Sequence, residues 1–235
     1  MPLISGASVG VGLIANDDKA PERPVVKNTA HDLIRLTELR EDPRYSAIDG
    51  NAVYSTTTGD NNSGAKLTQK KITVAVIDTG TDGTHERLSK NFIGYVDFVD
   101  GVFNPSVPLT TDPSKYIDND GHGTHVAGTI GSSDPSIGVA PGVQLIGLRV
   151  IDTNSRGHEV QEALQWVLEN RNEYNIVAVN MSLGYNDRYY TQRPGSGQYD
   201  PLYNTISGLI GKLEEAGVAV ISAAGNDYYS NHANN

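Results

Sequence analysis

The feature that most constrains the fold is an alternation of short apolar runs with amphipathic helical patterns, which begins near Lys71. The runs are rich in β-branched residues, as buried strands are, and they cover residues 72–77, 144–151, 176–181 and 218–223. In residues 159–174 and 204–216, apolar side chains instead recur every three to four positions, as on one face of a helix. This alternation predicts an α/β fold, in which a parallel sheet is flanked by helices.

The first 70 residues lack the alternation and are predicted to form an N-terminal arm, a linker and a short helix, ahead of the α/β domain over residues 71–235. Pro21 and Pro24 indicate an extended linker, and the leucine spacing in residues 30–39 indicates the helix. Residues 55–66 are polar and of low complexity, which predicts a loop. Residues 3–15 are apolar, but no Lys or Arg precedes them, which favours a flexible or strand-like arm over a signal peptide.

Composition and charge exclude several classes of function. A net charge of −10 argues against nucleic acid or an anionic membrane surface as the partner, because both attract a basic face. The chain has no cysteine, which excludes disulfides, thiol nucleophiles and thiolate metal sites. No apolar stretch approaches the roughly 20 residues of a membrane-spanning helix.

The candidate catalytic residues follow predicted strands or enter a predicted helix. Asp78 and Asn226 each come at or just after the end of an apolar run, where functional groups of parallel sheets gather. His122 stands between two glycines at the start of a run of small residues, which is typical of a loop that enters a helix. A carboxylate, an imidazole and an amide donor are three of the groups that acyl transfer by a serine nucleophile requires.

Two other chemistries are less favoured for these residues. Asp78-Thr79-Gly80 also matches the signature of aspartic proteases, but those enzymes need a second such copy, which the chain lacks. His122 and His125 are three positions apart, whereas zinc proteases space two histidines by four, with a glutamate beside the first. We therefore assign no metal ligands.

Taken together, the three motifs resemble those of the subtilisin-like serine proteases. They run Val-Ile-Asp-Thr-Gly at Asp78, Asp-Gly-His-Gly-Thr-His at His122, and Ala-Ala-Gly-Asn at Asn226. The resemblance implies that Asp78 orients the catalytic histidine, that His122 is the general base, and that Asn226 donates to the oxyanion. It also implies a structural role for the second histidine, His125, and no redox or nucleotide cofactor. The residues implied for binding a peptide substrate are Ser182, Leu183, Gly184, Gly157 and Gly225.

In this family the nucleophilic serine follows the oxyanion asparagine, in a Gly-Thr-Ser-Met-Ala type of turn that residues 227–235 do not contain. We therefore expect a serine endopeptidase fold whose C-terminal part is missing, and a chain that is inactive alone. Two alternatives are a non-catalytic peptide-binding remnant and a fragment that pairs with a complementing serine-bearing C-terminal segment. The resemblance further implies a secreted or extracellular protein.

Three segments depart from the family pattern. Residues 85–88 read His-Glu-Arg-Leu where the family tends to have His-Pro-Asp-Leu, so Arg87 replaces a carboxylate. Structural calcium is thus possible elsewhere, but the usual strong site is expected to be lost, since an arginine repels a cation and the loop at residues 132–137 is short. Residues 97–116 and the tyrosine-rich residues 185–203 are predicted to be insertions.

Overall fold

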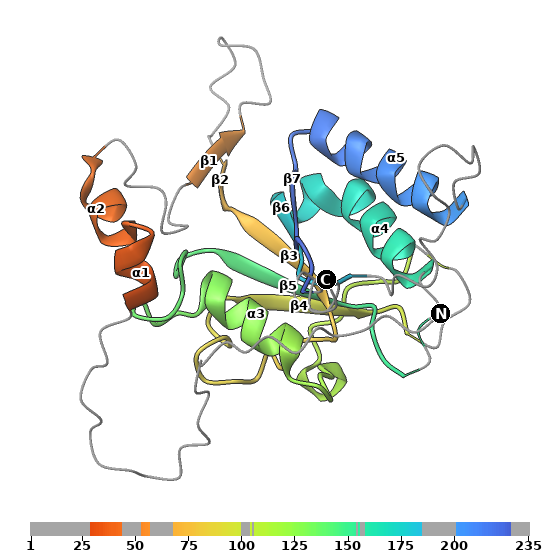
Figure 1. The fold of residues 1–235 in the computed structure, drawn as a ribbon, viewed down its shortest axis with the longest axis horizontal. Helices are drawn as coiled ribbons and strands as arrows, with labels where there is room; N and C mark the ends of the chain where they lie inside the picture. Colours follow the sequence, from red (N-terminus) through yellow and green to blue (C-terminus); the bar gives the residue numbers. More distant parts are fainter. Residues whose placement is uncertain are drawn as a thin grey trace, which may run out of the picture.

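A computed structural model describes residues 29–43, 53–56, 68–99, 104, 106–153, 155, 158–184 and 201–226. Its centre is a parallel sheet with the strand order β4-β5-β3-β6-β7 (Figure 1). These strands are β3 (Thr73–Asp78), β4 (Phe92–Asp97), β5 (Gln144–Arg149), β6 (Ile176–Met181) and β7 (Ala219–Ser222). The helices associated with the sheet are α3 (His122–Gly131), α4 (His158–Tyr174) and α5 (Pro201–Glu215), and a short 3-10 helix, η2, covers Pro113–Lys115.

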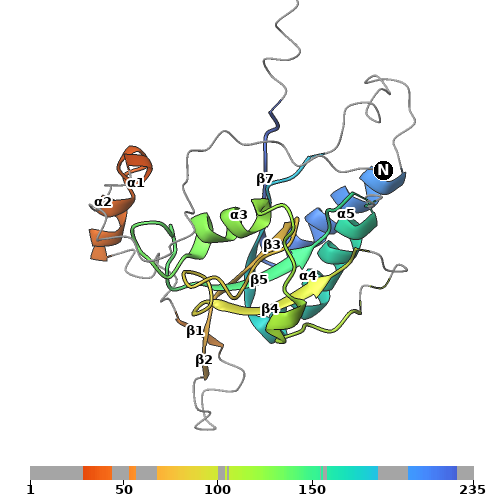
Figure 2. The ribbon, with the colours of Figure 1, turned by 90° about the horizontal axis from the view of Figure 1, so that it is seen from below.

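Helices cover both faces of the sheet, with α3 on one face and α4 and α5 on the other (Figure 2). The strands alternate accordingly. In β3, Ala75 and Ile77 pack with α4, whereas Val76 packs with Ala127 of α3. This architecture confirms the predicted α/β class.

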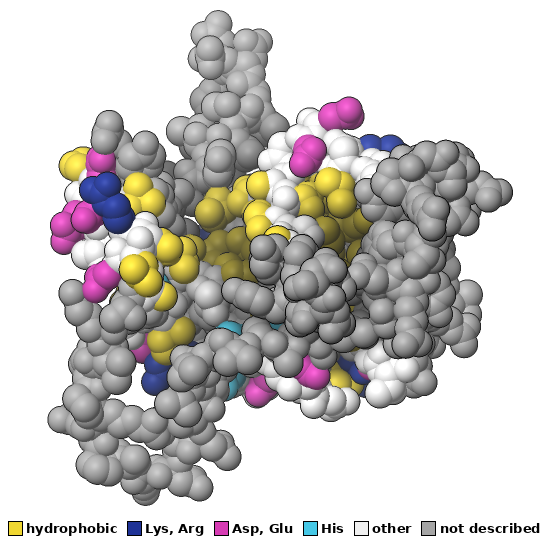
Figure 3. Space-filling model, in the orientation of Figure 1, with side chains coloured by type: hydrophobic (Ala, Val, Ile, Leu, Met, Phe, Trp, Pro, Cys, Tyr) yellow, Lys and Arg dark blue, Asp and Glu magenta, His cyan; other side chains and the backbone are white. Residues whose placement is uncertain are grey.

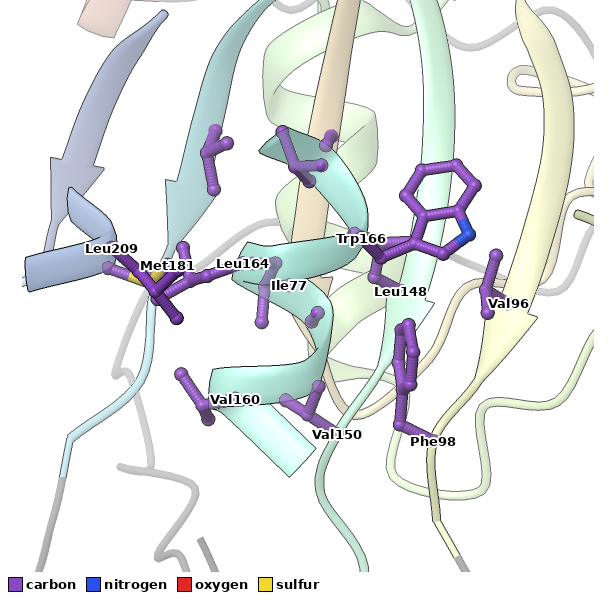
Figure 4. Packing of buried hydrophobic residues seen from close by; sticks show 14 of the residues in the cluster. Ile77, Val96, Phe98, Leu148, Val150, Val160, Leu164, Trp166, Met181 and Leu209 are labelled. Atoms are coloured by element: carbon purple, nitrogen blue, oxygen red, sulfur yellow. The ribbon is translucent and has the colours of Figure 1, made fainter. Parts of the chain in front are cut away.

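The larger core lies between the sheet and α4 (Figure 4). Trp166 of α4 is its largest side chain, and it is 1% exposed beside strand residues such as Leu148 and Val96. Its indole Nε1–H donates to the carbonyl of Val107, 2.8 Å away, so the one polar atom of the ring is satisfied. On the same helix the buried Glu162 accepts from the backbone N–H of Asn104 at 2.5 Å. Two side chains of α4 thus hold the segment that follows β4 against the core.

Four of the five strands were predicted to within two residues at each end, but β4 was not predicted. The strand carries four apolar residues around Gly94, but this run was not recognised as a strand. A Cβ on Gly94 would lie 2.2 Å from Cδ2 of Leu109, so the Leu109 side chain would have to shift to accommodate a larger residue. The region predicted as an insertion, residues 97–116, begins at the last residue of β4. Within it, Thr110 forms an antiparallel bridge with Tyr95 of that strand.

The prediction that β7 is a buried strand is wrong. Ile221 is 50% exposed and its neighbours Ala219 and Ser222 are exposed as well. The strand lies at the sheet edge, and among the described residues its contacts are with β6 and α5. Hydrophobic side chains gather on this face of the molecule, around the place where Figure 1 draws β6 and β7 (Figure 3).

The described N-terminal elements differ in detail from the predicted ones. The single predicted helix is two, α1 (Thr29–Leu33) and α2 (Leu36–Glu41), separated at Arg35, whose φ of 56° is left-handed. The predicted loop at residues 55–66 begins inside a hairpin of β1 (Val53–Thr56) and β2 (Thr68–Lys71). The predicted linker around Pro21 and Pro24 lies outside the described residues, as do residues 185–200 of the predicted tyrosine-rich insertion.

Candidate active site

Asp78 and His122 form the centre of the site. Asp78 is the last residue of β3 and is 0% exposed, and His122 is the first residue of α3. Oδ1 of Asp78 lies 2.7 Å from Nδ1 of His122 and also accepts from the backbone N–H of Thr79, at 2.7 Å. The other carboxylate oxygen, Oδ2, is buried and has no hydrogen-bond partner in the described part of the chain. The bond to His122 therefore supplies a large share of what stabilises this buried carboxylate.

The contact fixes the chemical state of the imidazole. The hydrogen bond with Asp78 raises the pKa of His122; burial opposes this effect, and the charges of Asp78, Asp120 and Asp118 add to it. Because Nδ1 faces the carboxylate, it carries the proton in the neutral ring. Nε2 then has a lone pair, and it has no hydrogen-bond partner among the described residues. The pair is thus arranged to accept a proton at Nε2.

Two glycines allow the backbone after Asp78 to lie close to α3 and to the loop that precedes it. A Cβ on Gly123 would lie 2.0 Å from the carbonyl oxygen of Gly80. A Cβ on Gly80 would lie 1.8 Å from the carbonyl oxygen of Ile117, and its φ of +127° is one that L side chains rarely adopt. The glycines on either side of the histidine differ in role: a Cβ on Gly121 would meet nothing within 4 Å, and it is the left-handed φ of +88° that favours glycine there.

A second hydrogen-bonded group, which sequence reasoning missed, surrounds the pair. Thr79 Oγ1 accepts from the backbone N–H of Gly123 at 2.9 Å and donates to Oδ1 of Asp118, also at 2.9 Å. Asp118 additionally accepts from Gly121 and Thr124 at the start of α3. The one local signal was an Asp four positions before the histidine, in a turn that enters a helix.

The remaining predicted residues lie at the same edge of the sheet. Ser182, Leu183 and Gly184 follow β6, the neighbour of β3, and Gly225 and Asn226 follow β7, the next strand beyond β6, so all come after the carboxyl ends of parallel strands. The Ser182 hydroxyl accepts from Nδ2 of Asn180 at 3.0 Å, and Leu183 is 9% exposed. Asn226 is exposed, and Gly225 has a φ of +95°. The remaining predicted binding residue, Gly157, lies outside the described residues.

Neither a metal cluster nor a membrane span is found in the described part of the chain. Its His, Cys, Asp and Glu side chains form no group of three or more that could hold a metal ion. None of its helices has the length and apolar character needed to cross a membrane.

The sequence of the chain matches a known protein family. The Subtilase family profile matches residues 69–235. The "Thermostable alkaline protease" of Halalkalibacterium halodurans is 31% identical over an alignment of 208 residues, which covers 81% of this chain and 48% of that protein. "Subtilisin E" of Bacillus subtilis is 32% identical over an alignment of 166 residues, which covers 68% of this chain and 35% of that protein.

A solved structure agrees with these sequence matches. The "S41 Psychrophilic Protease" superposes with a TM-score of 0.51 at 29% identity, over 66% of this chain and 46% of that one. The chain spans from about a third to a half of the length of these relatives. The family profile covers the sheet and the strand-end residues described above, and the chain therefore belongs to the subtilase family.

Proposed function

We propose that the chain supplies the Asp–His part of a subtilisin-type serine endopeptidase. The observation that carries this proposal is the 2.7 Å contact between the buried Asp78 and Nδ1 of His122 at the carboxyl edge of a parallel sheet. Membership of the subtilase family supports it, because that family is one of serine proteases. The reaction is hydrolysis of a peptide bond through an acyl-enzyme, and it needs no redox or nucleotide cofactor.

Each residue then has a distinct step. His122 Nε2 takes the proton from a serine hydroxyl as that oxygen attacks the scissile carbonyl, and later passes it to the leaving amine. Asp78 holds Nδ1–H in place and stabilises the imidazolium that forms. The side-chain amide of Asn226 donates to the oxygen on which negative charge develops. Ser182 is not the nucleophile in this proposal, because it belongs to the strand that lies beside the substrate.

The substrate is a peptide or protein whose extended backbone pairs with residues 182–184. This segment continues β6 beyond its last residue, Met181, and Gly184 is exposed. Pairing of this kind uses main-chain hydrogen bonds for affinity and side-chain pockets for specificity. The nucleophilic serine comes from a C-terminal segment, which we place against the exposed strand β7. We also propose an extracellular location, which rests on family membership alone.

The coding sequence that follows the codon for Asn235 provides the test. The chain is expressed with whatever residues that sequence encodes, and is assayed with a chromogenic peptide and a serine-reactive phosphonate. We expect both hydrolysis and labelling, with the label on a serine beyond residue 235. A stop codon directly after Asn235, with neither hydrolysis nor labelling by the chain, would replace the endopeptidase by a peptide-binding remnant or a fragment that needs a separate serine segment.

We further propose that arginines occupy the loop where relatives would hold calcium. Arg87 Nη1 lies 2.9 Å from Oδ2 of Asp134, so the loop carboxylate is already paired with a cation. Arg40 of α2 donates to three carbonyl oxygens of the same loop, those of Pro135, Gly138 and Val139, at 3.0, 2.6 and 2.8 Å. Carbonyl and carboxylate oxygens are the ligands of Ca²⁺, and here they accept from guanidinium groups instead. The residues present therefore do not fit a strong calcium site at this loop.

Removal of calcium is accordingly expected to leave the melting temperature unchanged within about 1 °C, measured by differential scanning fluorimetry with EDTA. A calcium site at a calcium concentration of 100 times its Kd would add about 2.7 kcal/mol to the stability, or roughly 5–10 °C to the melting temperature of a chain of this size.

Arg40→Ala is expected to lower the free energy of unfolding by about 2–3 kcal/mol, since three carbonyls lose a charged donor. Glu41→Ala, an exposed change on the same helix, is the matched control. A fall of several degrees in EDTA that is reversed by added calcium and is abolished by Asp134→Asn would contradict the proposal, because calcium bound elsewhere would not depend on this loop carboxylate.

A further inference from the structure

Asp118 is a partly buried carboxylate in the loop that leads into α3, and nothing in the proposed chemistry uses it. Its Oδ1 accepts from Thr79 Oγ1 and from the backbone N–H of Gly121, both at 2.9 Å. Its Oδ2 accepts from the backbone N–H of Thr124 at 2.8 Å and from Thr124 Oγ1 at 2.5 Å. Both oxygens therefore have two donors, which is more than a surface turn requires.

These bonds join the two elements that carry the proposed catalytic pair. Thr79 is the residue directly after Asp78, and Gly121 and Thr124 lie on either side of His122 at the start of α3. Thr79 completes the link because its hydroxyl oxygen also accepts from the N–H of Gly123, the residue directly after His122. The end of β3 and the beginning of α3 are thus tied through one carboxylate and one hydroxyl.

We propose that Asp118 is a positioning residue, which holds His122 at hydrogen-bonding distance from Asp78 by tying Thr79 to the first turn of α3. The proposal rests on the proposed roles of Asp78 and His122, and it assigns to the loop before the histidine a function that family membership does not supply. Asp118 acts through Thr79, Gly121 and Thr124 and touches neither reacting atom.

The charge of Asp118 suits this role. Burial alone would raise the pKa of its carboxyl, but the hydrogen bonds from Thr124, Gly121 and Thr79 outweigh burial and hold the pKa below its usual value. The carboxylate is therefore ionised throughout the range in which a histidine titrates. It caps the N-terminal turn of a ten-residue helix, where an anion is favoured, and its charge adds to the high pKa of His122.

An amide cannot replace this carboxylate. All four groups around Asp118 are donors, whereas the asparagine side chain has one oxygen and one NH₂ group. In Asp118→Asn, the amide oxygen can accept either from Thr79 and Gly121 or from Thr124, and the NH₂ group then faces the remaining donors. In either orientation the NH₂ group faces a backbone N–H that can only donate, that of Gly121 or that of Thr124, so at least one bond to the start of α3 is lost.

The experiment is NMR of the ring of His122 in the purified chain, which needs no substrate and no nucleophile. The Nδ1 proton, held by Asp78, gives a low-field signal whose exchange with water reports how tightly the contact is held. Titration of the ring carbons reports the pKa of His122. We compare the native chain with Asp118→Asn and with Thr79→Val, which keeps the shape of Thr79 and removes its hydroxyl. Asp112→Asn, an exposed carboxylate in the same loop that accepts from Ser114, is the matched control.

We expect Asp118→Asn and Thr79→Val to speed exchange of the Nδ1 proton about tenfold or more, because bonds to a charged acceptor are lost. Asp118→Asn should also lower the pKa of His122, and Asp112→Asn should leave the signal and its exchange unchanged. Native-like exchange and pKa in the folded Asp118→Asn chain would overturn the positioning role. If that variant does not fold, the same result in Thr79→Val would overturn it. If Asp78→Asn instead leaves the His122 signal the same as in the native chain, this result would contradict the Asp–His pair itself, and so the proposed function.

Discussion

Replacing His122 by alanine is expected to slow peptide hydrolysis by the proposed endopeptidase about 10⁶-fold, the size of the loss when the histidine is removed from subtilisin. The physical reason is that Nε2 of His122 is the proposed proton acceptor, and its ring is held by the 2.7 Å contact of Nδ1 with Asp78. Without the imidazole, the serine hydroxyl keeps its proton and is a weak nucleophile at neutral pH. The loss should appear in kcat, with little change in KM, because the ring binds no part of the ground-state peptide.

The measurement is steady-state hydrolysis of a chromogenic peptide by the chain expressed with its following coding sequence. His125→Gln is the matched control, because it removes an imidazole from the same helix, one turn further along. It should keep activity within a few-fold, and thermal melting confirms that both variants are folded. A fall of less than about 100-fold in folded His122→Ala would show that another group takes the proton.

The sequence predicted the framework of the sheet because its signals are local. Residues 176–181 form a strand over the predicted range, since a run of apolar, β-branched side chains suits a strand that is covered on both faces. The left-handed Gly217, with a φ of +81°, ends α5 as predicted from its place after the helical pattern. The positions of Asp78 and His122 at the ends of β3 and α3 were predicted for the same reason.

The features that were predicted wrongly or missed depend on contacts between residues that are distant in the chain. The burial of β7 was predicted from its composition, but burial is decided by what lies over a strand, and Ile221 is half-exposed. The link from Asp118 to Thr79 spans 39 positions in the chain, and the one local signal, an Asp shortly before the histidine, does not indicate which distant residue it contacts. The close approach that requires Gly123 is likewise visible only when the carbonyl of Gly80 is placed beside it.

Asp78→Asn is expected to lower kcat about 10⁴-fold, the size of the effect when the equivalent carboxylate of a serine protease becomes an amide. The amide carries no charge to stabilise the imidazolium. If its oxygen keeps the place of Oδ1, the NH₂ group takes the buried position of Oδ2, where the described residues offer no partner. If it turns over, its NH₂ group faces the N–H of Thr79. Both orientations weaken the hold on His122, and neither replaces the charge.

The same substitution should change the pH dependence in a defined direction. In the native chain the hydrogen bond with Asp78 raises the pKa of His122, so this bond adds stability below the unfolded histidine pKa of about 6.5 and loses it as the pH rises through the folded value. The native chain should therefore exceed Asp78→Asn in stability by more at pH 5.5 than at pH 9, in urea unfolding. The acid limb of kcat/KM should move to lower pH in the variant, because its imidazole has a lower pKa and is already neutral at a lower pH.

Asp120→Asn is the control, because it removes an exposed charge near His122 without touching the ring. It therefore distinguishes the effect of a nearby negative charge from the effect of the hydrogen bond with Asp78. It should shift the acid limb in the same direction and keep kcat within a few-fold, whereas a loss as large as that of Asp78→Asn would contradict the orienting role of Asp78.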